Sequence, residues 1–231
     1  MFIDVNGITL YYETEGQGRP VVLLHGNSED HTAMRGVSSL MKDRYAVYCL
    51  DSRGHGQSSP ADRLSYGDMA DDVARFIQAL RLERPILIGA SDGAIIGLLL
   101  AIRYPDLAGG LIAAGANRHP RELRGWFRAL LRLGALGKKP DPKLTLMLEE
   151  PNLTGDMLAQ IRIPVLVLAG QWDILAQKHT RGLAEAIPGA ALRILPGETH
   201  ASYITHAQRL LDASGDFLKS LETREEDVGN E

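Results

Sequence analysis

The chain has 231 residues, of which 45% are hydrophobic and 23% charged, a composition typical of one globular α/β domain with a large core. Its formal net charge of −4 gives no case for a nucleic-acid partner. A single cysteine, Cys49, excludes an internal disulfide framework and a structural zinc site, and the seven histidines show no metal-ligand spacing. We therefore expect no metal and no other cofactor.

Residues 1–18 lack the basic and apolar regions of a signal peptide, and no apolar run in the chain is long enough to span a bilayer. We expect a cytoplasmic protein in which residues 1–231 form a single domain. The sequence gives no prediction of the oligomeric state.

The first elements in the chain predict the edge and then the centre of a sheet. Residues 2–14 alternate loosely around Asn6-Gly7, a strong signal for a hairpin with a type I′ turn. Residues 21–24 form a continuous apolar run, which suits a central parallel strand covered on both faces. We expect two antiparallel strands at one sheet edge, followed by a central strand.

The loop after this central strand, His25-Gly26-Asn27, is a candidate ligand-binding loop because an open α/β sheet binds ligands at the carboxyl ends of its strands. Gly26 permits close approach of the backbone, and the backbone N–H of Asn27 is a candidate oxyanion donor. We interpret His25 as a residue that holds the loop through hydrogen bonds of its ring nitrogens. We do not assign it as the general base of a catalytic site.

The next predicted strand, residues 45–50, runs into a glycine-rich turn at residues 51–58. The turn lacks the spacing of a phosphate-binding loop, so we expect its polar side chains to tie the loop down by hydrogen bonds. Residues 66–82 carry apolar side chains at helical spacing, with Ser65 available as N-cap.

Residues 85–104 contain the stretch around which the chain is organised. Residues 89–93 fit G-x-S-x-G between an apolar strand and a helix, the nucleophile elbow. We expect Ser91 to project its hydroxyl above the sheet edge, and the backbone N–H of Asp92 to point at the oxygen of a tetrahedral intermediate. The motif alone is weak evidence, and its strand-and-helix setting strengthens it.

After a short strand at residues 111–114, an arginine-rich and lysine-rich segment interrupts the alternation of strands and helices. We expect a cap insertion over about residues 117–160. Residues 123–132 predict an amphipathic helix, whose apolar face we expect to pack over the active site with its arginines in solvent. Two alternatives remain open: arginines that face the cleft and favour an anionic substrate, or a basic helix that lies on an acidic membrane surface.

Two further residues follow predicted strands on the rim that carries Ser91. Asp173 comes directly after the apolar strand 163–170 and is the candidate acid. His200 follows the last strand, 191–195, on an expected loop, and is the candidate base. Its rival His206 falls inside a predicted helix at residues 204–221. The acidic tail, residues 225–231, is expected to be disordered.

The order serine, acid, histidine is the one used by the α/β-hydrolase family, which the chain resembles over nearly its whole length. The turn Asp51-Ser52-Arg53-Gly54-His55-Gly56 adds to the match. The resemblance implies an eight-stranded, mostly parallel sheet with helices on both faces and a small helical cap. It also implies Ser91 as nucleophile, His200 as general base and Asp173 as orienter of the imidazole.

Among subgroups, the chain is similar to small-capped serine esterases, enol-lactonases and proline iminopeptidase-like hydrolases. This implies a serine hydrolase that cleaves a small carboxylic ester through an acyl-enzyme, without a cofactor. Two alternatives stay open: a hydrolase of an anionic lactone, suggested by the basic insertion, and a non-catalytic ligand-binding member of the fold. The expected partner is a small-molecule ester or lactone substrate.

Overall fold

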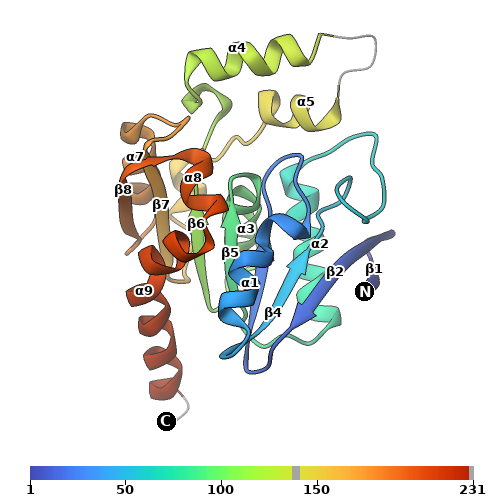
Figure 1. The fold of residues 1–231 in the computed structure, drawn as a ribbon, viewed down its shortest axis with the longest axis vertical. Coiled ribbons are helices and arrows are strands. Elements are labelled where there is room, and N and C mark those ends of the chain that lie inside the picture. The colour runs from blue at the N-terminus through green and yellow to red at the C-terminus, as the bar shows by residue number, and fades with distance from the viewer. Residues whose placement is uncertain (137–140, 229–231) are drawn as a thin grey trace.

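The computed structural model of the protein describes residues 1–136 and 141–228 (Figure 1). Eight strands form one sheet in the order β1-β2-β4-β3-β5-β6-β7-β8. The pairs β1·β2 and β2·β4 are antiparallel and all other neighbouring pairs are parallel, which confirms the predicted fold class. The strands are β1 Phe2–Val5, β2 Ile8–Glu15, β3 Arg19–Leu24, β4 Tyr45–Leu50, β5 Ile86–Ala90, β6 Gly110–Ala114, β7 Val165–Trp172 and β8 Ala191–Thr199.

The predicted hairpin lies at the edge of the sheet, where β1 pairs with β2. Its turn residues Asn6 and Gly7 have φ values of 48° and 73°, the positive values that a type I′ turn requires at both positions. The hairpin prediction is therefore confirmed.

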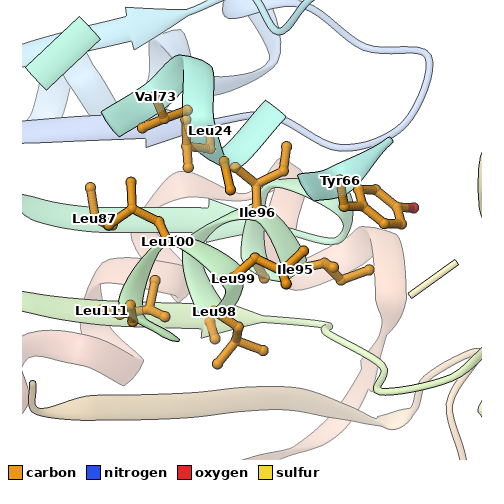
Figure 2. Close-up of a cluster of buried hydrophobic side chains, with 14 of the residues drawn as sticks. Leu24, Tyr66, Val73, Leu87, Ile95, Ile96, Leu98, Leu99, Leu100 and Leu111 are labelled. Carbon is orange, nitrogen blue, oxygen red and sulfur yellow. The ribbon is translucent and has the colours of Figure 1, made fainter. Parts of the chain in front are cut away.

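Helices cover both faces of the sheet, because the buried strands send alternate side chains to opposite sides. In β3, Val22 and Leu24 join a core with α2 and α3, whereas Val21 and Leu23 join a second core with α1 and α9. Figure 2 shows the first core, in which Leu24 and Leu87 of the sheet meet side chains of α2 and α3. The helices are α1 Arg35–Met41, α2 Tyr66–Ala79, α3 Asp92–Arg103, α4 Gly125–Gly134, α5 Pro142–Glu149, α6 Gly155–Leu158, α7 Gln177–Ala186, α8 His200–Thr205 and α9 Ala207–Val228, with 3₁₀ turns η1 His31–Met34 and η2 Pro120–Glu122.

The segment between β6 and β7, called the insertion below, contains η2, α4, α5 and α6. In Figure 1 its helices α4 and α5 lie at one end of the molecule, beyond the sheet. The backbone N–H of Arg124 donates to the carbonyl of Ile174 at 2.8 Å, so α4 begins beside the chain that leaves β7. Part of the predicted basic segment, residues 137–140, lies outside the described residues.

The chain near the C-terminus differs from the prediction in two ways. Strand β8 continues to Thr199, and His200 is the first residue of helix α8 rather than part of a loop. Thr199 and Ser202 form a capping box that starts this helix, a local signal that the strand pattern had obscured. The predicted disorder of residues 225–228 is wrong, because α9 runs to Val228; residues 229–231 lie outside the described part. Among the described helices, none is long and apolar enough to cross a membrane.

Candidate active site

Ser91 sits at a sharp turn between β5 and α3, as the elbow motif predicts. Its φ of 51° and ψ of −112° are strained for a residue with a side chain. A Cβ at Gly93 would overlap the carbonyl of Leu24 in β3, and one at Gly89 would overlap the carbonyl of Gly93. Both glycines are therefore required by the close approach of helix and sheet.

The structure joins the three predicted side chains in one line of hydrogen bonds. The Nε2 atom of His200 lies 3.1 Å from Oγ of Ser91, and its Nδ1 atom lies 2.7 Å from Oδ1 of Asp173. These residues are 109 and 27 positions apart from His200 in the chain, and meet because β5, β7 and β8 end at the same edge of the sheet. An imidazole in this position can accept the serine proton while the carboxylate fixes its tautomer.

Asp173 is only 1% exposed, and its carboxylate accepts further hydrogen bonds besides the one from His200. Burial raises its pKa, but the hydrogen bond and charge of His200, with the backbone N–H groups of Leu175 and Gly170, outweigh burial and hold the pKa below its ordinary value. The hydroxyl of Tyr203 also donates to Oδ2 at 3.1 Å. Sequence reasoning missed Tyr203, although its i+3 spacing from His200 is a signal that could have found it once α8 is recognised.

The two residues predicted to supply oxyanion donors belong to segments near Ser91. Asn27, in the loop after β3, lines the same cavity as Ser91, and Asp92, the first residue of α3, follows Ser91 directly in the chain. The side chains of the two residues bind each other, with Nδ2 of Asn27 donating to Oδ2 of Asp92 at 2.9 Å. Nδ2 of Asn27 also reaches the carbonyl of Lys143 at 3.2 Å, which links this loop to α5.

Asp92 carries a buried carboxyl group directly behind the elbow. Burial raises its pKa to about 6, and hydrogen bonds from Asn27 and Tyr66 offset part of that effect. No role for this side chain was predicted, because the motif constrains only the glycines and the serine. This carboxyl, with its pKa of about 6, belongs to the residue that follows Ser91.

A cavity of about 570 Å³ opens beside Ser91 and His200, within the range of small-molecule sites. Its wall is mostly apolar and is supplied by the insertion and by α8, with Phe127, Leu131 and Met147 from the former and Ile204 from the latter. In the described part of the chain, no arginine or lysine lines this cavity. Its lining includes one acidic residue, Glu29. The alternative in which the arginines face the cleft is therefore wrong for the described residues.

The polar residues around the site hold loops in place. His25 is 1% exposed; its Nδ1 lies 2.7 Å from the carbonyl of Gly26, and its Nε2 accepts from the backbone N–H of Ser52. The structural interpretation of His25 is thus supported by its geometry. The rival His206 is exposed and bonds the carbonyl of Ser202 instead of Ser91.

One group of side chains in the described residues has the composition of a metal site: Asp30, His31 and Asp51. The carboxylate of Asp51 already accepts hydrogen bonds from the backbone and ring of His31 and from the backbone of Gln57. These contacts explain the group as a tie between two loops, as expected for the turn after β4.

Comparison with known proteins places this geometry in a family. The model of the alpha/beta hydrolase fold matches residues 19–136, which are 118 of the 231 residues. The chain therefore belongs to the α/β-hydrolase fold family.

Individual relatives extend over almost the whole chain. "Serine hydrolase BPHL" of Mus musculus is 26% identical over 249 aligned positions, which cover 94% of this chain and 85% of that protein. Among solved structures, an N-acyl homoserine lactone degrading enzyme, Est816, has a TM-score of 0.81 at 24% identity and covers 94% of this chain and all of its own. The enol-lactonase from Burkholderia xenovorans has a TM-score of 0.79 at 20% identity, with 95% and 100% coverage. At these identities the two structures support the fold alone.

Proposed function

We propose that the protein is a serine hydrolase that cleaves a small, uncharged carboxylic ester. The observation that carries the proposal is the line of hydrogen bonds from Ser91 through His200 to Asp173 at the floor of an apolar cavity. The relative described as a serine hydrolase supports the reaction class. Residues 117–160 act as a cap that supplies part of the cavity's apolar wall.

In this mechanism, Oγ of Ser91 attacks the ester carbonyl while Nε2 of His200 takes the serine proton. The carbonyl oxygen becomes an oxyanion that accepts hydrogen bonds from the backbone N–H groups of Asn27 and Asp92, each worth roughly 3 to 4 kcal/mol. His200 then gives the proton to the leaving alcohol, which leaves an acyl-enzyme. Water attacks this acyl group with His200 again as base, and the acid product departs. Asp173 stays ionised and stabilises the imidazolium.

The cavity favours an uncharged substrate over the anionic lactone that the basic insertion had suggested. Its wall is apolar, and the carboxylate of Glu29 would repel a second anion at short range. Glu29 accepts a hydrogen bond from the backbone N–H of Gly26 at 2.8 Å, so it is held at the cavity rather than in solvent.

The proposal is tested with p-nitrophenyl esters of increasing acyl length and with a carboxylate-bearing analogue of the best one, at low and high salt. We expect turnover by the wild type, a clear preference for the uncharged ester, and no turnover by Ser91→Ala that retains its circular dichroism spectrum. A preference for the anion that salt removes would contradict the uncharged class. Tight binding without turnover would favour the non-catalytic alternative.

A further inference from the structure

The segment that carries Asp173 leaves the sheet at the end of β7 and runs beside the start of α4. Leu123 and Leu175 form an antiparallel β-bridge between these two segments. The backbone N–H of Arg124 donates to the carbonyl of Ile174 at 2.8 Å. Both leucines are buried, and they belong to one small apolar cluster. The insertion is therefore bound directly to the segment on which the candidate acid stands.

The side chain of Arg124 adds a further bond to this segment. Arg124 is exposed, as predicted for the arginines of this helix, yet its Nε atom donates to the backbone carbonyl of Asp173 at 2.8 Å. A hydrogen bond from a charged donor is stronger than one between neutral groups. This bond ends on the main chain of the residue that orients the imidazole of His200.

The bonds that Asp173 makes within its own turn are long. The backbone N–H groups of Gly170 and Leu175 donate to its carboxylate at 3.3 Å each, and its own N–H donates to the carbonyl of Gly170 at 3.3 Å. Such distances exceed the usual range of about 2.7 to 3.2 Å for these bonds. Arg124 supplies a bond of ordinary length from outside the turn, and so fixes the main chain where the turn itself holds it weakly.

We propose that Arg124 is a positioning residue that acts through Asp173. By holding the backbone of Asp173, it keeps the carboxylate in its 2.7 Å contact with Nδ1 of His200. The effect on the position of the carboxylate stands on this geometry, whereas its effect on turnover rests on the proposed ester hydrolysis. Trp126 and Phe127 of the same helix line the cavity, so one element of the insertion both shapes the substrate site and fixes the acid.

Two substitutions of similar length separate the hydrogen bond from the charge. In Arg124→Gln, the side-chain amide nitrogen is as many bonds from the main chain as Nε of arginine, so a donor is kept while the charge is lost. In Arg124→Met the donor is lost as well. Arg132→Met removes an exposed arginine from the same helix and is the matched control. Both arginines are exposed, so the variants are expected to fold, which circular dichroism checks.

Turnover of the best p-nitrophenyl ester measures the effect on the reaction. We expect Arg124→Met to lower kcat about tenfold with KM changed less than about threefold, since a small misplacement far from the reacting atoms can cost up to about a hundredfold. Arg124→Gln should stay within about threefold of the wild type, and Arg132→Met should match the wild type.

The same substitution in the Asp173→Asn background tests whether Arg124 acts through the carboxylate. There Arg124→Met should lower kcat by less than about twofold, because the group whose position it sets is already gone, and mutations that act through one another are not additive. A role confined to the stability of the insertion would lower kcat equally in both backgrounds.

A measurement that needs no turnover separates this proposal from the proposed hydrolysis. A proton held in a charge-assisted bond between an imidazole and a carboxylate gives a far-downfield signal in the proton NMR spectrum. We expect this signal for Nδ1 of His200 in the wild type, in Arg124→Gln and in Arg132→Met. It should broaden or disappear in Arg124→Met, because the displaced carboxylate no longer protects the proton from exchange with water.

Three outcomes overturn the proposal. One is an unchanged downfield signal in Arg124→Met. Another is a loss in Arg124→Gln as large as in Arg124→Met, which would mean that the hydrogen bond is not what matters. The third is an equal loss of kcat from Arg124→Met with and without the Asp173 carboxylate. A wild type that turns over no ester, but whose downfield signal is lost in Arg124→Met, would leave the positioning role intact and count against the hydrolase proposal alone.

Discussion

Replacing Asp92 by asparagine should change how the stability of the protein depends on pH. Asp92 is buried, and the pKa of its carboxyl in the folded protein is about 6, against an ordinary value of 3.8. Because the folded state binds this proton more tightly than the unfolded state, the group stabilises the fold most at low pH. That stabilisation is lost as pH rises from about 4 to about 6. The two values differ by roughly two pH units, and each unit is worth about 1.4 kcal/mol, so the loss is about 3 kcal/mol.

The substitution also changes the free energy of unfolding by an amount that does not depend on pH, and this amount does not enter the prediction. The new asparagine side chain would keep one acceptor for the two donors, Asn27 and Tyr66, and the lost bond costs about 1 to 3 kcal/mol at every pH. The variant's free energy of unfolding relative to wild type should nevertheless rise by about 3 kcal/mol between pH 4 and pH 7.

Urea unfolding of both proteins at closely spaced pH values measures this difference. Asp106→Asn, which changes an exposed carboxyl beyond the other end of α3, is the matched control and should follow the wild-type curve. Parallel curves for wild type and Asp92→Asn would refute the reasoning, because they would show that burial does not perturb Asp92.

Three other substitutions probe the site and its supports. Asp173→Asn should lower kcat by about 10⁴ with the fold retained, measured by ester turnover and circular dichroism; a loss below tenfold would count against its role. Tyr203→Phe should lower the free energy of unfolding by about 1 kcal/mol in urea and kcat by less than about tenfold, since Asp173 keeps its bond from Gly170. Gly93→Ala should yield little soluble protein, whereas Gly125→Ala, with open space around it, should express normally; equal yields would refute the packing argument.

The sequence predicted the elements whose local patterns are strong. Alternation and the Asn6-Gly7 turn predicted the hairpin, and continuous apolar runs predicted the central strands. The elbow motif predicted the strained turn at Ser91. Positions at strand ends then brought Asp173 and His200 to the same edge, because the carboxyl ends of parallel strands share one edge.

The features that the sequence did not predict have two causes: a local signal that was overlooked, and contacts between distant elements. The start of α8 at His200 depends on a capping box that follows a strand without a break. The contact of Tyr203 with Asp173 joins two elements whose packing no local pattern encodes. The packing of α4 was predicted in part: Trp126, Phe127 and Leu131 line the cavity as expected, whereas Leu130 of the same predicted face is exposed.

The most direct test of the proposed mechanism is intact mass after treatment with a fluorophosphonate, which reacts with activated serines. It is applied to the folded wild type, to Ser91→Ala and to His200→Ala. We expect one adduct on the wild type, none on Ser91→Ala, and strongly slowed labelling of His200→Ala, because the base that activates the hydroxyl is absent. No adduct on the wild type, or equal labelling of the Ser91→Ala variant, would contradict the assignment of Ser91 as the nucleophile.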